Sequence, residues 1–405
     1  MLIELILALA VGVLIGTFTG LFPGIHINLV SAFLLSVSTF LLTITTPLSL
    51  VIFIASLSIT HTFIDFIPSI YLGAPNEDSF LSVLPGHKLL LRGQGHKAVI
   101  ITSLGCLSGI LIFLILAPLF IITLPIIYPY IQRIMHIILI LASLFLITRE
   151  KGIYKKVLAF FVFILSGFLG IAVLNNPIIK EPLLPLLTGL FGASSLIISI
   201  KQKTIIPSQQ IDNLKNLGFS KISFLKTMFA SIIASPLPSF LPGMGSSQAA
   251  LIGTEIQGKS NEKEFLFLIS SINVVVMAFS FITLYTINKT RTGSAAAISK
   301  LLPALSFKDL LLILTAITIT GILVFFLSIK ISKLFAKYLH KMNYSKISTG
   351  ILIILTGVSF LFSGWLGLLV LISSTSLGIF AILTEVKKIM LMGCLMMPTI
   401  LFYIF

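Results

Sequence analysis

The chain has 405 residues, of which 57% are hydrophobic and 10% charged, and its mean hydropathy is +1.15. Apolar stretches of about twenty residues recur along its whole length, which is typical of a polytopic membrane protein. Hydrocarbon offers no water to free backbone groups, and the stretches are continuous instead of alternating ten-residue strands. The spans are therefore predicted to be helices.

The formal net charge is +15, but the basic residues lie in short loops between apolar runs, where they set orientation instead of binding nucleic acid. Cys106 and Cys394 both lie within apolar segments, which argues against a disulfide framework or a cysteine metal site. The first apolar run, from Leu2 to Phe22, has no basic residues before it and is longer than a signal-peptide core. It is predicted to be a retained first span.

Apolar runs bounded by charge, Pro or Gly predict the spans in chain order. The first half gives 2–22, 27–46, 48–72, 98–124, 126–148, 156–174 and 182–200, and the second gives 222–241, 244–256, 265–288, 309–329, 347–363, 365–384 and 389–405. Each run follows its counterpart by about 205–220 positions. This predicts an N-terminal transmembrane repeat (1–200), a cytoplasmic polar connection (201–221) and a C-terminal repeat (222–405), with re-entrant pieces near 76–86 and 290–302.

The basic loops give the orientation. If the spans alternate, then 149–156, 201–221, 330–346 and 385–388 all fall on one side, which the positive-inside rule makes the cytoplasm. Each repeat has about seven segments. Because this number is odd, the second repeat crosses the membrane in the opposite orientation, and the basic loops accordingly follow different spans in the two copies. We therefore expect an inverted-topology, all-α, multi-pass protein of the cell membrane with both termini extracellular.

Both halves carry a Pro-Gly pair inside an apolar run: LFPGIHINLV at 21–30, with Pro23 and Gly24, and FLPGMGSSQA at 240–249, with Pro242 and Gly243. Such a pair leaves backbone groups without helical partners. A tight turn or kink explains either copy alone. Paired breaks in inverted halves are instead typical of a transporter binding site near the midplane, where helix N-termini suit an anion.

Short polar side chains follow both breaks, and neutral hydroxyl and amide donors can bind carboxylate or phosphate. The residues are His26 and Asn28 in the first half, and Gly245, Ser246, Ser247 and Gln248 in the second. Each alone is equally explained as a helix cap. We expect Ser247→Ala to weaken anion binding by about 1–3 kcal/mol without unfolding the protein.

A second pair of polar stretches lies within 66–98 and 281–306. Each predicts a re-entrant hairpin or, alternatively, an ordinary hydrophilic loop. Asn76 and Ser79 are the candidate binding residues in the first, and Thr290, Arg291 and Thr292 in the second.

His61 and Asp65 stand four residues apart in one predicted span and so share a helical face. Ionisable residues at membrane depth indicate a pathway for a proton or cation. The pair is predicted to couple protons or, through Asp65, to bind sodium; a neutral buried pair, or a place nearer the interface, is the alternative. No other cofactor is predicted.

Three segments carry a family resemblance: GLFPGIHINLVSA (20–32), SIYLGAPNEDSFLSVLPGHKLLLRGQGHKAV (69–99) and SFLPGMGSSQAALIGTEI (239–256). Through them the chain resembles the large permease subunit of the tripartite tricarboxylate transporters. It is shorter than typical members, His26 stands where a small residue is usual, and Val83-Leu84-Pro85-Gly86 replaces an Asp-Gly-Tyr-Pro element.

The resemblance implies a secondary, cation-driven carrier of di- or tricarboxylates, served by a soluble extracytoplasmic solute-binding protein and a small membrane subunit. A homodimer is compatible with the sequence. The leading prediction is therefore a permease for an organic anion that works by alternating access around the paired breaks.

Two other classes of function are alternatives: a carrier of a lipid-linked phosphate, and an enzyme such as an intramembrane protease or a lipid-modifying transferase. A carrier of a lipid-linked phosphate such as polyprenyl phosphate would use the same helix-terminus chemistry. An intramembrane zinc protease would need His-Glu-x-x-His, whereas the chain has His61-Thr-Phe-Ile-Asp65, and an aspartyl protease would need a second buried aspartate. An enzyme is therefore not expected.

Overall fold

The computed structural model describes residues 2–22, 27–73, 83–202, 206–213, 217–241, 245–258, 260–339 and 343–405. Within these ranges all regular structure is helical, and eight helices are long and apolar enough to cross a membrane. An all-helical, multi-pass membrane protein is thereby confirmed.

The elements of the first half are α1 Leu2–Leu21, α2 Ile27–Ser36, α3 Ser38–Leu41, α4 Pro47–Ile64, α5 Phe66–Tyr71, α6 Val83–Leu91, α7 Gly95–Arg133, α8 Met135–Thr148, α9 Ile153–Leu174, α10 Leu183–Leu187, the π-helical η2 Thr188–Ala193 and α11 Ser194–Lys201. Those of the second are α12 Lys221–Ala234, α13 Pro236–Phe240, α14 Ser246–Gln257, α15 Glu262–Ile287, α16 Gly293–Leu301, α17 Phe307–Tyr338, α18 Tyr344–Leu383, η5 Lys388–Met392 and α19 Gly393–Ile404.

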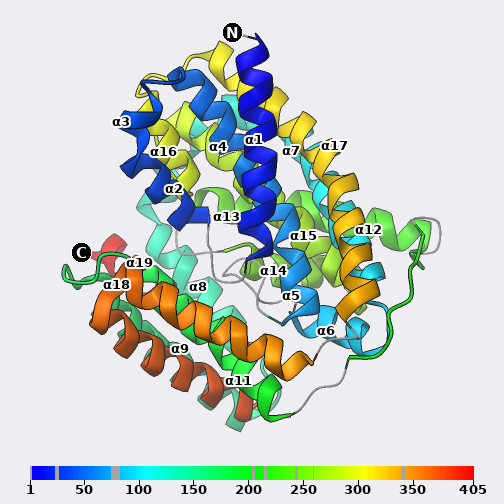
Figure 1. Ribbon diagram of the computed structural model, residues 1–405. Coiled ribbons are helices and arrows are strands. Elements are labelled where there is room, and N and C mark those ends of the chain that lie inside the picture. The colour runs from blue at the N-terminus through cyan, green and yellow to red at the C-terminus, as the bar shows by residue number, and fades with distance from the viewer. Residues whose placement is uncertain are drawn as a thin grey trace.

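Two hydrophobic cores organise these helices. The first core takes its residues mainly from α1, α2, α4–α7, α12 and α14–α17, and it reaches the start of α18. The second takes them mainly from α8–α10, η2, the later part of α18, η5 and α19. In Figure 1 the corresponding bundles occupy the upper and lower parts of the molecule. Each core therefore draws on both halves of the sequence.

The centre of the first bundle is formed by α4 and α15, one from each half. The most apolar window of the span from Pro47 to Tyr71 is completely buried, and that of α15 is 94% buried. A helix that is apolar all round belongs in such an interior. These two helices also carry serines, threonines, His61 and Asn273 with almost no exposed surface, and Asp65, just after α4, is buried as well.

Small residues let α1 approach α4 closely. A Cβ atom added at Gly12 would lie 2.7 Å from the Phe53 carbonyl oxygen, and one at Gly16 would lie 2.6 Å from that of Leu57. Gly20 continues the same stripe against the His61 carbonyl. Backbone contact of this kind is how membrane helices gain packing energy where lipid offers no hydrophobic drive between them.

Most predicted spans have a helix in the expected place, but several predicted boundaries differ: the span 27–46 is divided between α2 and α3, and α17 runs to Tyr338, beyond the predicted end at 329. The turn expected near 125 is absent, because α7 continues to Arg133 with Pro118, Pro125 and Pro129 inside it. Neighbouring helices and local adjustments make proline tolerable in membrane helices. The turn expected near 364 is present: helical geometry is interrupted at Gly364, where φ is 64°.

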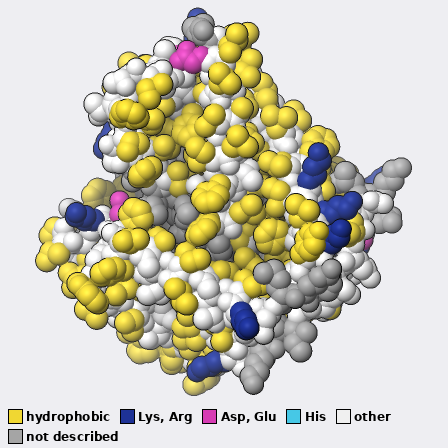
Figure 2. Space-filling model, in the orientation of Figure 1, with side chains coloured by type: hydrophobic (Ala, Val, Ile, Leu, Met, Phe, Trp, Pro, Cys, Tyr) yellow, Lys and Arg dark blue, Asp and Glu magenta, His cyan; other side chains and the backbone are white. Residues whose placement is uncertain are grey.

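The outer surface is that of a lipid-exposed protein. Leu14, Ile115 and Leu361 are each at least 70% exposed. Figure 2 shows hydrophobic side chains over most of the visible face, with Lys and Arg gathered mainly toward its right and lower edges. Apolar surface between basic margins is expected of a protein whose loops emerge from a bilayer.

Candidate functional site

The N-terminus of α16 is held by the helix that follows the first Pro-Gly pair. The backbone N–H of Gly293 donates to Oδ1 of Asn28, in the first turn of α2, at 2.7 Å. A Cβ atom at position 293 would lie 2.7 Å from Cα of Asn28, so only glycine permits this approach. Two segments far apart in sequence thus meet through main-chain contact.

A cluster of hydroxyl groups lies next to this contact. Oγ of Ser58, on α4, donates to Oγ of Ser294 at 2.7 Å, and Oγ of Ser31, on α2, lies 3.2 Å from the same atom. All three serines are at most 1% exposed. Three helices from both halves therefore share one small, buried polar contact.

The residues just before α16 bind elements of the second half. Thr292 caps the helix: its Oγ1 accepts from the N–H of Ala295 at 3.2 Å and donates to Oγ of Ser280, on α15, at 3.0 Å. Nε of Arg291 donates to the carbonyl of Pro238, on α13, at 2.6 Å. Thr290 is exposed.

The N-terminus of α14 follows the second Pro-Gly pair and is fully enclosed, because Ser246, Ser247 and Gln248 have no exposed surface. Oγ of Ser246 donates to Oδ1 of Asn273, on α15, at 2.9 Å. Oε1 of Gln248 accepts from the N–H of Gly245 at 2.9 Å. Nε2 of Gln248 is buried and has no hydrogen-bond partner within the described ranges.

An unsatisfied buried amide donor is costly, by about 1–3 kcal/mol in proteins. A bound acceptor or an ordered water would remove that cost. The N-terminus of α14 therefore has the chemistry of a site for a ligand with acceptor oxygens.

The structure brings several predicted site residues together. Asn28 contacts Gly293, and Arg291 contacts Pro238, four residues before Pro242. The segment 291–293 thus binds the chain beside each of the two predicted breaks. Seven other predicted site residues lie outside the described ranges: Pro23, Gly24, His26, Asn76, Ser79, Pro242 and Gly243.

Sequence reasoning missed the residues that line these contacts, chiefly Ser31, Ser58, Ser280, Ser294 and Asn273. A usable signal existed for Ser58, because SITHT at 58–62 puts four polar side chains among five consecutive positions of an apolar span. The others are single polar residues in helices, whose partners only the tertiary structure supplies.

His61 and Asp65 lie at the junction of α4 and α5, and both are 4% exposed. Nδ1 of His61 lies 3.1 Å from Oγ1 of Thr19, on α1, and the N–H of Asp65 donates to the His61 carbonyl at 2.9 Å. His61 lies one helical turn from Ser58, and Asp65 lies about two turns from it. In the described residues no group of three or more His, Cys, Asp and Glu is placed to hold a metal ion.

Comparison with known proteins places these features in a family. The model of the tripartite tricarboxylate transporter TctA family matches residues 6–393. The chain belongs to this family. An uncharacterized protein of Methanocaldococcus jannaschii is 30% identical over 410 residues, which cover 98% of this chain and 99% of that protein. No solved structure matches the chain.

Membership of the TctA family confirms the resemblance of the three quoted segments, all of which lie inside the matched region. It identifies a multi-pass membrane protein of a transporter family, for which no enzymatic activity is expected. The contacts described above are therefore those of a TctA-family permease.

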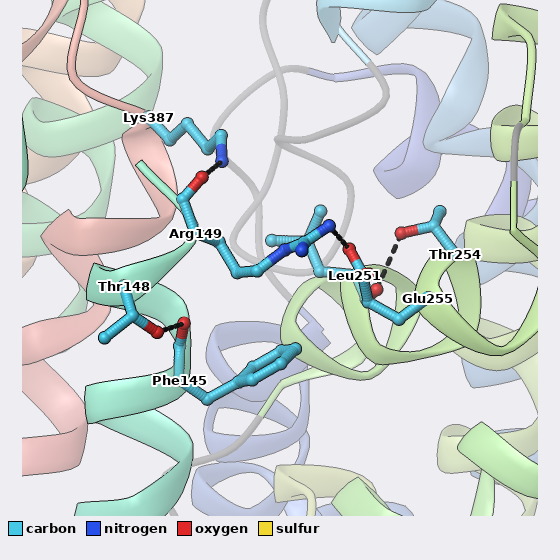
Figure 3. Close-up of polar contacts among 7 residues, drawn as sticks. All are labelled: Phe145, Thr148, Arg149, Leu251, Thr254, Glu255 and Lys387. Atoms are coloured by element: carbon cyan, nitrogen blue, oxygen red, sulfur yellow. Dashed lines mark hydrogen bonds and ion pairs between the residues drawn. The ribbon is translucent and has the colours of Figure 1, made fainter. Parts of the chain in front are cut away.

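The far end of α14 is tied to the second bundle of this TctA-family protein. Glu255 forms an ion pair with Arg149, which ends α8, and Nζ of Lys387 donates to the Arg149 carbonyl at 3.0 Å (Figure 3). Residues of α14 also pack against both cores. The helix whose N-terminus carries Ser246 to Gln248 thus bridges the two bundles.

Reversing one charge of this ion pair should slow transport about two- to fivefold, the rate equivalent of a surface pair worth up to about 1 kcal/mol. Both side chains are more than a third exposed, so stability should change little. Arg149→Glu and Glu255→Arg would be compared with the double exchange in a transport assay. Failure of the exchange to restore the rate would mean that the pair does not couple the bundles.

Proposed function

We propose that this protein is a secondary transporter for an organic anion, a di- or tricarboxylate, that works by alternating access and is driven by a cation. The observation that carries the proposal is the enclosed N-terminus of α14, where Nε2 of Gln248 is buried and has no hydrogen-bond partner among the described residues. Membership of a tricarboxylate transporter family supports the substrate class.

The donor chemistry suits an anion with acceptor oxygens, such as a carboxylate. Ser246, Ser247 and Gln248 are neutral, so they bind an anion without burying a charge of their own. The partial positive charge of the α14 and α16 N-termini adds to their effect. The guanidinium of Arg291 lies beside the same region through its bond to Pro238.

An inverted repeat accounts for the order and packing of the elements. By sequence position α4–α5 corresponds to α15, α6 to α16, and α7 to α17. Each long helix packs against the central helix of the other half, α7 against α15 and α17 against α4. This exchange is what a two-fold relation in the membrane plane would produce, and it supports alternating access around the paired breaks.

His61 and Asp65 are proposed to couple the cation, a proton or sodium. His61 lies on α4 one turn from Ser58, whose hydroxyl group joins α4 to α16, and Asp65 follows one turn later, just after α4 ends. A charge change at His61 therefore lies close to a contact between helices of both halves. A partner set of a small membrane subunit and an extracytoplasmic solute-binding protein is also proposed, following the tripartite family.

The test is uptake of labelled citrate and succinate into proteoliposomes under an imposed sodium or proton gradient. Ser247→Ala should weaken apparent affinity by about 1–3 kcal/mol, or about 5- to 150-fold, through loss of a buried hydroxyl group. The matched control is Ser373→Ala, because Ser373 is exposed on α18. Equal affinity in Ser247→Ala and wild type would remove Ser247 from the site.

Gradient-dependent uptake of either compound would name the driving ion. If folded protein takes up neither, a lipid-linked phosphate or a requirement for the solute-binding protein becomes the better explanation. Dependence on a polyprenyl headgroup would separate these two.

A further inference from the structure

A cavity of about 850 Å³ lies between the two bundles. Its walls come from α6, from α14, from the start of α15 and from the turn that joins α18 to η5. Leu251 and Lys387, which line it, also flank the Arg149–Glu255 ion pair (Figure 3). The volume is large enough for a small polyvalent anion.

The carboxylates of this cavity are already neutralised. Glu262 pairs with Arg92 at 3.7 Å and Glu385 pairs with Lys155 at 2.7 Å. Neither Arg92 nor Lys155 lines the cavity. Both negative charges are therefore offset by cations outside the walls.

The lysines of the cavity have no such compensation. Nζ of Lys387 donates to the Arg149 carbonyl at 3.0 Å, and Nζ of Lys388 donates to Oγ of Ser195 at 2.6 Å, so both bind neutral acceptors. Lys88 has no carboxylate partner within the described part of the chain. Lys88, Lys387 and Lys388, from both bundles, thus line one cavity without an ion pair to any carboxylate among the described residues, whereas both carboxylates of the cavity wall pair with other cations.

His87 adds a neutral group to the same wall. Its Nδ1 is buried and has no hydrogen-bond partner among the described residues, and its ring centroid lies 6.2 Å from that of Tyr344. Burial lowers the pKa of the imidazole, because desolvation disfavours its charged form. A neutral imidazole nitrogen without a partner can bind a ligand directly or through water.

We propose that this cavity is a second anion site, a vestibule that holds a small, soluble, polyvalent carboxylate through Lys88, Lys387 and Lys388. It deepens the proposed function and rests on it. Leu251 lies one turn beyond Gln248 on α14, so the same helix leads from the cavity to the first site. Because the lysines come from α6 and from the 385–388 turn, a ligand with two or more carboxylates can contact both bundles.

Occupancy is tested without transport by amine labelling of the whole purified protein. Citrate, compared with chloride at equal ionic strength, should slow acylation of Lys88 at least threefold while leaving Lys308 unchanged. Lys308 is an exposed lysine at the start of α17, outside the cavity. Equal slowing at both lysines, or none at Lys88, would overturn the proposal.

The vestibule role is tested by Lys88→Gln in proteoliposomes of known orientation. KM for citrate should rise about tenfold when citrate is supplied from the side of the basic loops, with Vmax and the opposite-side KM unchanged. Lys346→Gln, on exposed α18 surface outside the cavity, is the control. Because Lys88 is exposed, its replacement should leave the melting temperature unchanged.

The outcomes separate the two proposals. Protection of Lys88 without any citrate uptake would keep the anion site and reject the proposed function. Uptake with an unprotected Lys88 and an unchanged KM would keep the function and reject the vestibule. Protection that appears only in vesicles containing anionic lipid, and not with citrate in detergent, would identify a lipid headgroup and overturn the soluble-carboxylate proposal.

Discussion

Asn28→Asp should raise KM for a carboxylate substrate at least tenfold and leave the fold intact. The new carboxylate keeps the acceptor that binds the Gly293 N–H, and a negative charge near a helix N-terminus is stabilising. The same charge would repel an anion bound beside α16, because like charges about 4 Å apart repel by about 4 kcal/mol at an effective dielectric constant of about 20. The tenfold increase is therefore a lower bound.

The control for this experiment is Asn175→Asp, which adds an identical charge at an exposed position after α9. Melting temperatures of both variants and KM for citrate would be measured together. A KM for Asn28→Asp equal to that of the control would place the substrate away from α2 and α16. A lowered melting temperature would show that position 28 requires the amide for folding.

Gly16→Ala should destabilise the protein by about 1–3 kcal/mol. The added methyl group would lie 2.6 Å from the Leu57 carbonyl oxygen, so α1 must move away from α4 along the stripe of Gly12, Gly16 and Gly20. The displacement would also strain the contact between Thr19 and His61. We therefore expect loss of cation coupling together with a lower melting temperature in detergent.

Gly357→Ala is the matched control, since a Cβ atom at that position in α18 meets nothing within 4 Å. In a helix this replacement is expected to be neutral or stabilising by up to about 1 kcal/mol, because alanine is the better helix former. If the two variants melt at the same temperature, the close approach of α1 and α4 does not contribute to stability.

The contrast between His61 and Ser58 shows which residues of the candidate site could be predicted from the sequence. His61 and Asp65 stand out because ionisable residues are rare in apolar spans, so composition alone marks them. Ser58 is marked only weakly, by the polar residues that follow it at 60–62, since a serine in a membrane helix usually bonds the carbonyl four residues back, as Ser58 does with Ile54. Its second bond, to Ser294 across the bundle, depends on how α4 and α16 pack.

The helix ends show similar limits. The predicted span starts at 48 and 309 lie within two residues of the observed helix starts, where the side chains of Thr46 and Ser306 each accept from the N–H three residues on. The prolines inside α7 led to the incorrect prediction of a turn near 125. Proline ends a helix in water, but the surroundings of a membrane helix can satisfy the carbonyls it leaves free.

The sequence by itself determined that the chain is a helical membrane protein, where most of its spans lie and which family it resembles, because hydrophobic length and local breaks are properties of contiguous residues. Only the tertiary structure decided that both bundles combine the two halves, and that segment 291–293 binds both Asn28 on α2 and α13. Only it showed the three lysines that share one cavity. These contacts join residues far apart in the chain, and their partners are selected by the packing of whole helices, which no local pattern encodes.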